Sequence, residues 1–482
     1  MAFTPATNQV LPLQDTTSQD TTLQDTNGRI YNVLPDSPLG QGGQGEVLRV
    51  AEDKYLAIKL AFTRDPQEIQ AYQAHVRALR FLPLSPQLRL SMPIAILQDR
   101  AGYVMRLLGS MQPLGRLMPN ENKDLDNVPL PEWLLHSIGD GDIAKSHKAL
   151  AQYNATGGLR LRLNLLLQIA ELLGTLHAQG LLFADLSPNN VYISKGATPE
   201  VWLIDVDNIC YEDSNQSHFY TPKYGAPELV LGQGINSQNS DAFSFALLAF
   251  ELLTMLKPFE GKAADSADFE ENAGIEFSWI LDPNDHSNNV APSELMMLPF
   301  FLSRPLFDLF AQTFEDGKTK PSLRPPLWLW RYALSSTLDV TVQCPHCGMS
   351  WVFTEHPDSL TCPFCDAQLL LLTAQCHGSL LYVHECVQEP FYLPTRLFTP
   401  VNTMADTPCL QVTLLENQHL RFALCDVKRE FIWAFAGQGQ HALNSVVSEF
   451  AVPLQALQEH ELILQCTTDL IWQVSFTVMG SA

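Results

Sequence analysis

The feature that most constrains the fold is a helix, loop and strand unit near the middle of the 482-residue chain. Leucines recur at helical spacing over Leu159–Gln179, which predicts one long amphipathic helix. The polar loop Phe183–Val191 follows, and the apolar run Val201–Ile204 then predicts a buried strand. Asp205 comes directly after this strand, and carboxylate oxygens are ligands that Mg²⁺ prefers. The unit predicts a domain of mixed helices and strands with an acidic residue at a strand end.

A glycine-rich stretch lies far upstream of this unit. Residues Gly40–Val47 read GQGGQGEV, and glycines at this spacing let a backbone approach phosphate groups closely. Taken alone, the stretch is equally typical of a turn between two strands. Lys59 follows 12 residues after Val47, at the end of the sequence LAIK. The two features together favour a phosphate-binding site.

Further motifs follow in a fixed order along the chain. They are FADLSPNN with Asp185 and Asn190, VWLID ending at Asp205, TPKYGAPE ending at Glu228, SDAFS with Asp241, KPF at 257–259 and RP at Arg324. With the glycine loop and Lys59, this order resembles the eukaryotic-like (Hanks-type) serine/threonine protein kinase superfamily over about residues 31–335. The resemblance implies an α+β fold class and a bilobal kinase fold, with a β-rich small lobe to about residue 104 and a helical large lobe.

The resemblance also implies a role for each matching residue. Asp185 would be the catalytic residue that accepts the proton of a substrate hydroxyl, and Lys59 would hold the phosphates of ATP. Asn190 and Asp205 would bind Mg²⁺ or Mn²⁺. The rest of the ATP site would consist of Gly40, Gln41, Gly42, Gly43, Gly45, Val47, Ala57, Glu68, Met105 as gatekeeper and Leu107 in the hinge.

Two further roles follow from the same resemblance. Asp241 would brace the catalytic loop from below, and Arg324 would form an ion pair with Glu228. The acidic partner that kinases usually provide for Lys59 is harder to place. A helix is expected over 66–81, and Glu68 is its only acid, although it lies closer in sequence to Lys59 than is usual. Glu68 is the predicted partner of Lys59.

The chain departs from the family pattern around the catalytic aspartate. Phe183 and Ala184 replace the usual His-Arg pair, and Ser187 stands where the family usually has lysine. The missing arginine usually pairs with a phosphorylated activation loop, so we expect activity that does not depend on such phosphorylation. Asp207 replaces the glycine of the metal-binding motif and either caps the turn or adds a metal contact.

These departures leave two functions open. The preferred function is an ATP-dependent serine/threonine protein kinase, because Lys59, Asp185, Asn190 and Asp205 are all present. The alternative is a weak or inactive nucleotide-binding pseudokinase that serves as a scaffold for partner proteins.

Nine of the ten cysteines lie after residue 340, and four of them form two Cys-Pro-x-Cys pairs. Cys344, Cys347, Cys362 and Cys365 have the spacing of two zinc knuckles, and four thiolates suit a structural Zn²⁺ with no open position. The sequence therefore predicts a zinc ribbon over residues 336–370.

Cys376, His377, His384 and Cys386 are an alternative second metal site, although the segment is more typical of a β-hairpin.

The ends of the chain have different patterns. Residues 1–30 are polar, with an imperfect LQDTTSQD and TTLQDT repeat, and we expect a flexible segment. Short alternating strands at 419–425, 430–436, 461–466 and 471–478 predict a small all-β sandwich over 371–482. This tail weakly resembles forkhead-associated-type domains through its tryptophan strand and glycine turn. It is either a protein-docking module or a packing domain without a ligand.

Charge and composition limit the partners. The 29 basic and 52 acidic residues give a net charge of −23, which argues against nucleic acid and anionic membranes as partners. No signal sequence or long apolar run is visible, so a cytoplasmic protein is expected.

The sequences WILDPNDHSNN (279–289) and FEDG (314–317), followed by the cysteine pairs, resemble bacterial kinases of tellurite-resistance-type gene clusters. That resemblance implies a protein substrate, a metal-dependent protein phosphatase and a von Willebrand factor A-domain protein as partners.

Overall fold

The described chain divides into two compact units. The computed structural model describes residues 22–34, 38–41, 45–118, 130–131, 134, 142–196, 198–214, 218–265, 273–291, 295, 297–354, 360–398, 407–426, 428–435, 438–467 and 473–480. The first unit contains residues 1–118, 168–289 and 310–329, and the second contains 119–167, 290–309 and 330–482. Within the described parts, no helix combines the length and the apolar composition needed to cross a membrane.

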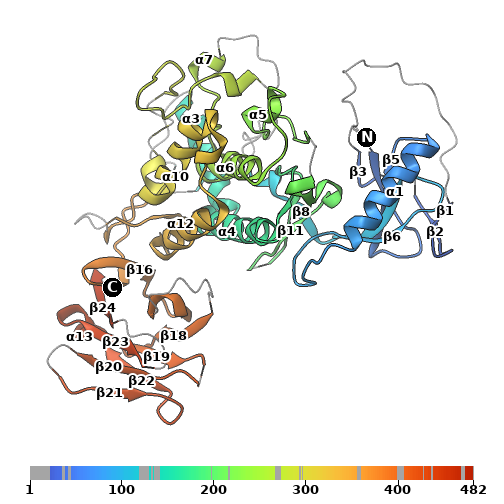
Figure 1. Ribbon diagram of the computed structural model, residues 1–482. Coiled ribbons are helices and arrows are strands. Elements are labelled where there is room, and N and C mark those ends of the chain that lie inside the picture. The colour runs from blue at the N-terminus through green and yellow to red at the C-terminus, as the bar shows by residue number, and fades with distance from the viewer. Residues whose placement is uncertain are drawn as a thin grey trace. The chain divides into compact units, whose positions relative to one another are not determined.

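The first unit begins with a five-stranded antiparallel sheet and one long helix (Figure 1). The strands lie in the order β3 (Gly40–Gln41), β4 (Gly45–Arg49), β5 (Leu56–Ala61), β7 (Gly102–Arg106) and β6 (Pro93–Ile96). Helix α1 (Pro66–Arg80) packs against β6 and β7. It begins at Asp65, whose carboxylate accepts hydrogen bonds from the first free amides of the helix. Helix α1 thus matches the helix expected over 66–81.

A short hairpin adds to this part of the unit and corrects the expectation of a flexible segment over 1–30. Strand β1 (Thr22–Gln24) pairs with β2 (Ile30–Asn32), and Leu23 and Tyr31 are buried in the same core as the sheet. The Tyr31 hydroxyl donates a 2.9 Å hydrogen bond to Asp25, so that the turn's carboxylate is also satisfied. Each of these strands alternates exposed, buried and exposed residues, but this pattern is hard to recognise in the sequence because the segment is mostly polar. Residues 1–21 lie outside the described residues.

The helical part of the first unit surrounds a buried helix, α6 (Gln238–Thr254). Ser237 and Ser240 form a capping box at its start, and nearly all of its side chains are buried. Phe250 on this helix packs against aromatic rings from two other segments, Trp279 and Phe310. Helix α4 (Gly158–His177), whose first ten residues belong to the second unit, coincides with the long amphipathic helix predicted from the leucine spacing.

Two short sheets hold the loops between these helices. Strands β10 (Val191–Ser194) and β11 (Val201–Leu203) pair with each other, and β8 (Met111–Pro113) completes their sheet. Strand β9 (Leu181–Leu182) pairs with β12 (Cys210–Tyr211). The loop after β9 and the turn after β11 are therefore held by strands at both ends. The other elements of this part are η1 (Leu114–Arg116), η3 (Val206–Asn208), η4 (Glu212–Ser214), α5 (Pro227–Val230), α7 (Lys262–Asp265), η5 (Ala273–Glu276), α11 (Asp316–Thr319) and η6 (Pro321–Leu323).

The second unit contains helical segments, the cysteine pairs and a β-sandwich. Its helices include α3 (Asp142–Ala155) and α9 (Leu298–Phe301), and α10 (Arg304–Phe314) and α12 (Leu327–Asp339) each belong to both units. Strands β13 (Thr341–Gln343) and β14 (Ser350–Val352) form a hairpin around the first cysteine pair. A small core that includes Val342, Trp351 and Leu371 surrounds the cysteines.

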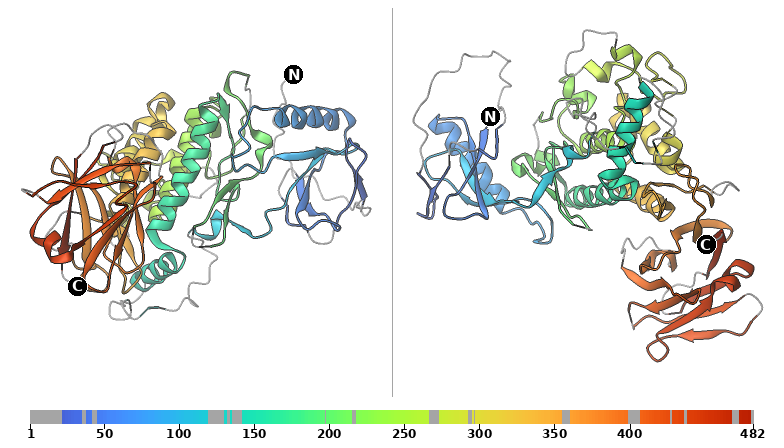
Figure 2. Two further views of the ribbon diagram at one scale, coloured as in Figure 1. Left: turned by 90° about the horizontal axis from the view of Figure 1, so that it is seen from below. Right: turned by 180° about the vertical axis from the view of Figure 1, so that it is seen from behind.

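The sandwich matches the all-β tail that the sequence predicts (Figure 2). One sheet has the order β16 (Ser379–Glu385), β15 (Leu370–Cys376), β24 (Gln473–Gly480), β23 (Leu462–Cys466), β20 (Phe431–Phe435) and β21 (His441–Leu443). The other has the order β17 (Phe391–Pro394), β18 (Pro408–Leu414), β19 (His419–Leu424) and β22 (Glu449–Pro453). The core contains Leu372 and Phe476 from the first sheet and Leu410 and Phe422 from the second. Two short helices, η8 (Thr395–Phe398) and α13 (Leu454–Glu459), interrupt the strands.

Candidate active site

Lys59 lies in the middle of β5 and forms ion pairs with two carboxylates. Its Nζ is 2.9 Å from Oδ2 of Asp207 and 3.1 Å from Oδ1 of Asp205. Burial by itself would lower the pKa of Lys59, but the two carboxylates outweigh burial and the pKa is raised. The structure therefore brings Lys59 and Asp205 together, as expected for residues that would share one nucleotide and its metal ion.

The predicted pairing of Lys59 with Glu68 is corrected. Glu68 lies exposed in the first turn of α1, and its carboxylate accepts a hydrogen bond from the Thr63 hydroxyl. The turn after β11 supplies Asp207 as the partner instead. The sequence signal for this partner is the replacement of the motif's glycine by Asp207, although the sequence alone predicts only a cap or a metal contact there.

Asp205 holds a backbone conformation that few residues other than glycine adopt. Its φ of 55° and ψ of 48° lie in the left-handed region, and it stands at the start of η3. Aspartate tolerates this region better than most residues do, because its short polar side chain bonds locally. The conformation turns the chain sharply after β11, and the Asp205 and Asp207 carboxylates both reach Lys59.

Asp185 lies in the loop after β9 with both carboxylate oxygens hydrogen-bonded. Asn190 Nδ2 donates to Oδ2 of Asp185 over 3.0 Å, and the Thr221 hydroxyl donates to Oδ1 over 2.7 Å. Burial and the nearby charge of Asp205 raise the pKa of Asp185, although these two hydrogen bonds and Lys59 oppose the shift. A carboxylate that is fixed in orientation and made more basic is suited to accept a proton.

The backbone of the loop after β9 is hydrogen-bonded to the buried carboxylate of Asp241, as expected. Asp241 accepts hydrogen bonds from the amides of Phe183 and Ala184, each over 2.9 Å, and lies 3.0 Å from Nε2 of His177. Ala184 has a φ of 67°, which is unfavourable for alanine, and the bond to its amide helps to maintain it.

A second ion pair fixes the end of the segment that contains Thr221. The Arg324 guanidinium donates two hydrogen bonds of 2.7 Å to the two oxygens of Glu228, and the Arg324 side chain is fully buried. The sequence predicted this pair, and the prediction is confirmed. The bidentate geometry suits an arginine and a carboxylate.

Asn236 is a residue that the sequence analysis missed. Its side chain accepts a hydrogen bond from the Phe219 amide and donates to the Phe219 carbonyl, each over 2.8 Å. It also donates to the Ala184 carbonyl over 3.3 Å, so one buried amide connects the catalytic loop with the segment before Thr221. A lone asparagine before a helix carries no sequence pattern that would identify this role.

Other predicted nucleotide-binding residues occupy the sheet of the first unit. Gly40 and Gln41 pair with Val47 and Glu46 across β3 and β4, whereas Gly42 and Gly43 lie outside the described residues. Gly45 needs to be glycine for a packing reason, since a Cβ there would lie 2.2 Å from the Leu60 carbonyl oxygen.

The residues predicted for the base-binding side lie on β5, on β7 and just after β7. Ala57 is fully buried and is paired with Met105 across the two strands. The amide of Leu107 donates a 2.7 Å hydrogen bond to the Tyr55 carbonyl. That amide is therefore already used within the protein and is not free to donate to an adenine ring.

The four cysteine sulfurs form one cluster. Sγ of Cys344 is 3.6 Å from that of Cys365, Sγ of Cys347 is 3.7 Å from that of Cys362, and all four lie within 4.8 Å of one another. A Zn–S bond of about 2.3 Å gives a tetrahedron with edges of about 3.8 Å, which these separations fit. The donor set and its geometry thus suit a tetrahedral Zn²⁺, in agreement with the sequence.

The hairpin around the first cysteine pair is bonded to helices of the same unit. The Ser350 hydroxyl accepts a 2.8 Å hydrogen bond from the Leu159 amide and so caps the first turn of α4. Arg160 donates to the Thr341 carbonyl over 2.7 Å, and Asn154 donates to the Cys347 carbonyl over 3.1 Å. The cysteine cluster is therefore attached to the start of the helix that leads toward the catalytic loop.

The alternative of a second metal site at Cys376 and Cys386 is not supported. Strand pairing places Cys376 opposite Ser379, beside the hairpin turn, and the Cys386 amide bonds to Leu370 at the far end of the same strands. Among the residues that the structure describes, the cysteine cluster is the one group of three or more His, Cys, Asp or Glu side chains whose ligand atoms lie close enough to share a metal ion.

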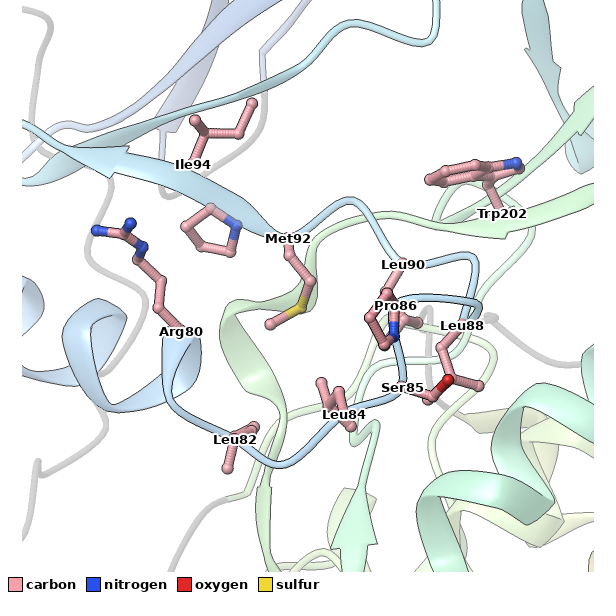
Figure 3. A pocket seen from close by; sticks show the side chains of 11 residues that line it. Arg80, Leu82, Leu84, Ser85, Pro86, Leu88, Leu90, Met92, Ile94 and Trp202 are labelled. Atoms are coloured by element: carbon pink, nitrogen blue, oxygen red, sulfur yellow. The ribbon is translucent and has the colours of Figure 1, made fainter.

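A separate pocket lies beside the end of α1 (Figure 3). Most of the residues that line it are apolar, among them Met92 and Trp202, and Arg80 is its charged member. None of the residues that line it belongs to the group formed by Lys59, Asp185, Asn190 and Asp205. The residues suited to phosphoryl transfer therefore lie outside this pocket.

Comparison with known proteins gives a family match in the helical part of the chain. The protein kinase domain family matches residues 143–320. The chain is 24% identical over 242 residues to the serine/threonine-protein kinase Pkn1 of Myxococcus xanthus, which is 47% of this chain and 29% of that kinase. It is 35% identical over 108 residues to the serine/threonine-protein kinase pkn2 of the same species, or 20% of this chain and 13% of that kinase.

A human protein gives a similar match. Ribosomal protein S6 kinase alpha-3 of Homo sapiens is 33% identical over 99 residues, which is 20% of this chain and 13% of that kinase. The chain spans less than a third of the length of each of these relatives. The kinase-domain match includes Asp185, Asn190 and Asp205, and together with the names of the relatives it supports a protein serine/threonine kinase.

Proposed function

We propose that this protein is an ATP-dependent serine/threonine kinase that transfers the γ-phosphoryl group of ATP to a hydroxyl of a protein substrate. The observation that carries the proposal is that Lys59 forms an ion pair with Asp205 and Asn190 a hydrogen bond with Asp185, while the charges of Lys59 and Asp205 both act on Asp185. Lys59 and Asp205 come from segments that are far apart in sequence, so their meeting is a property of the fold. Few chemistries need a buried lysine, two carboxylates and an amide in this arrangement.

Each of these side chains would have a separate role in the reaction. Lys59 would hold phosphate oxygens, because its ammonium stays charged beside two carboxylates. Asp205 and Asn190 offer the oxygen ligands that Mg²⁺ prefers, and Mg²⁺ would neutralise charge on the phosphates when it is bound. Asp185 would orient the substrate hydroxyl and accept its proton, helped by the raised pKa of its carboxyl group. Thr221 and Asn190 keep that carboxylate in a single orientation.

The test is phosphoryl transfer from γ-labelled ATP in the presence of Mg²⁺, measured as autophosphorylation and with a generic basic protein substrate. The Asp185→Asn variant keeps the size of the side chain and removes the base, so transfer should fall by about 10²–10⁴-fold. Equal rates for the two proteins would refute the proposed enzyme.

A specific observation favours the pseudokinase scaffold as a second candidate. Ser187 is buried and stands where the family usually has a lysine beside the transferred phosphoryl group. A scaffold would show an increase in Tm with Mg-ATP but no transfer above the level of Asp185→Asn. In that case the function would be assembly of partners, among which we propose a metal-dependent phosphatase and a von Willebrand factor A-domain protein.

We also propose that Cys344, Cys347, Cys362 and Cys365 bind one structural Zn²⁺ and that the C-terminal sandwich is a docking module related to forkhead-associated domains. The sulfur separations support the zinc site. The two-sheet architecture supports the domain type. The docking role is tested by incubating the full chain and a chain that ends before residue 371 with a library of phosphothreonine peptides. Equal retention of peptides by the two proteins would contradict it.

A further inference from the structure

Lys59 receives its carboxylate from an unusual place in this chain. Asp207 lies two residues after Asp205, on η3, and its Oδ2 is 2.9 Å from Nζ of Lys59. Helix α1 has its only acid, Glu68, exposed in the first turn and bonded to Thr63. The helix therefore contributes no carboxylate to Lys59, and the metal-binding turn contributes two.

The Asp207 carboxylate is surrounded by donors that fix its position. The Tyr103 hydroxyl on β7 donates to Oδ1 over 2.6 Å, and the Tyr72 hydroxyl on α1 donates to Oδ2 over 3.0 Å. His75, one turn further along α1, bonds to the Asp207 carbonyl. The Asp207 carboxylate is thus bonded to α1, β5 and β7 at the same time. A buried carboxylate with this many partners is a fixed point of the structure.

Of the two carboxylates that face Lys59, Asp207 is the one without a proposed metal-binding role. Asp207 accepts hydrogen bonds from Tyr103 at Oδ1 and from Tyr72 at Oδ2, and its Oδ2 also forms the ion pair with Lys59. Asp205 interacts with Lys59 through Oδ1. When Asp205 also ligates a divalent cation, its negative charge is shared between that cation and Lys59. Asp207 has no such competing duty, because its oxygens already accept from two tyrosines and Lys59.

We infer that Asp207 is the positioning residue for Lys59, and that Tyr72 and Tyr103 in turn position Asp207. The inference rests on the proposed function for its consequence in catalysis. Asp207 takes the place that an acidic residue of α1 would hold, and hydroxyl groups connect α1 to the metal-binding turn. The position of Lys59 then depends on the turn after β11 and not on the charge of the helix.

The test compares three single variants of the full chain. Asp207→Asn keeps the shape of the side chain and an oxygen acceptor for Tyr103 but removes the charge that faces Lys59. Glu68→Gln removes the charge of α1, and Glu200→Gln removes an exposed carboxylate just before β11 as a matched control. We expect kcat/KM for ATP to fall by about 10- to 100-fold in Asp207→Asn and to stay within about twofold in the other two.

The division of the effect between KM and kcat separates positioning from a general loss of structure. Misplacement of Lys59 should raise KM for ATP and lower kcat together, at temperatures well below the Tm of each variant. Because Asp207→Asn could fail to fold, a Tyr72→Phe/Tyr103→Phe double variant provides a second measurement. It keeps the carboxylate, frees its orientation and should lower kcat/KM by about three- to tenfold.

Either of two results would overturn the inference: wild-type kinetics in Asp207→Asn, or a larger loss in Glu68→Gln than in Asp207→Asn. Failure of the proposed function has a different signature. If the wild type transfers no phosphate, the shift in Tm caused by Mg-ATP replaces kcat/KM as the readout. Loss of that shift in Asp207→Asn and its retention in Glu68→Gln would keep the positioning role in a protein that binds nucleotide without catalysis.

Discussion

The Thr221 hydroxyl donates a 2.7 Å hydrogen bond to one carboxylate oxygen of Asp185. The other oxygen accepts from Asn190, so that the plane of the carboxylate is set from two sides. Thr221 belongs to the segment that Asn236 and Glu228 hold in place at its two ends. The order of that segment is therefore connected directly to the orientation of the group that would accept the substrate's proton.

Loss of the Thr221 hydroxyl should lower turnover more than substrate binding. We expect Thr221→Ala to reduce kcat by about tenfold, because Asp185 loses one of its two orienting bonds, with KM for ATP changed by less than about twofold. Thr221→Ser keeps the hydroxyl and should restore most of the rate. Steady-state kinetics with γ-labelled ATP measure both constants. A Thr221→Ser variant as slow as Thr221→Ala would show that the hydroxyl does not carry the effect.

Activity should not depend on phosphorylation of the segment that precedes Thr221. Ala184 offers no guanidinium to a phosphate, and Asn236 already bonds both backbone groups of Phe219. We expect a Ser214→Ala/Ser217→Ala double variant to keep its rate within about twofold; Ser217 lies outside the described residues. Protein treated with a phosphatase and then repurified should also keep its rate. Loss of activity after either change would contradict this prediction.

Two carboxylates of the site should affect stability in opposite directions. Burial raises the pKa of Asp185, so its charged form is less favourable in the folded state than in the unfolded state. That destabilisation develops as pH rises through the raised pKa. The pKa of Asp207 is lowered, so its charge stabilises the fold above its unfolded pKa and that stabilisation is lost as pH falls through the folded pKa.

The corresponding measurement is Tm as a function of pH for two isosteric variants. At about pH 8, Asp185→Asn should have a Tm equal to or above that of the wild type, whereas Asp207→Asn should have a lower one. The Asp185 difference should shrink as the pH is lowered through the raised pKa of that group, whereas the Asp207 difference should shrink only below about pH 4, where the unfolded chain takes up the proton first. Differences of the same sign for the two variants at about pH 8 would contradict the assigned environments.

The buried ion pair between Arg324 and Glu228 should contribute far more to stability than an exposed pair. Glu228→Gln leaves the fully buried guanidinium without its counter-charge, and we expect a loss of about 3–5 kcal/mol in the free energy of unfolding. Arg304 and Asp308 form an exposed pair on α10, and Asp308→Asn should lose at most about 1 kcal/mol. Denaturant unfolding measures both variants. Equal losses in the free energy of unfolding for the two variants would mean that burial does not determine how much an ion pair stabilises the fold.

Sequence patterns predicted the parts of this structure that depend on local spacing. Helix α4 follows from its leucines. The Asp241 hydrogen bonds and the Arg324–Glu228 pair are implied by the resemblance of the motifs to those of protein kinases. The partner of Lys59 could not be predicted in the same way. Asp207 reaches Lys59 only because a left-handed turn at Asp205 and two tyrosine hydroxyls from other elements position it.

A different reason explains the hairpin at residues 22–32. Its stability depends on burying Leu23 and Tyr31 in the core of a sheet formed by later residues, together with one buried carboxylate, Asp25. Neither the alternation of three-residue strands nor an isolated aspartate stands out against a polar background. Tertiary burial, and not local propensity, decides such short elements.

Removal of zinc should destabilise the start of α4 as well as the cysteine cluster. Ser350 caps the first turn of this helix and Arg160 bonds to Thr341, so both contacts need the β13–β14 hairpin that the cysteines anchor. We expect about one zinc ion per chain in the wild type and much less in Cys362→Ser, because a structural site needs all four thiolates. Amide hydrogen exchange at Leu159 and Arg160 should accelerate in that variant.

Cys425→Ser, which changes an exposed cysteine outside the cluster, should retain the zinc and the slow exchange. Unchanged exchange at these two amides in a zinc-free protein would show that the helix start is held without the cluster.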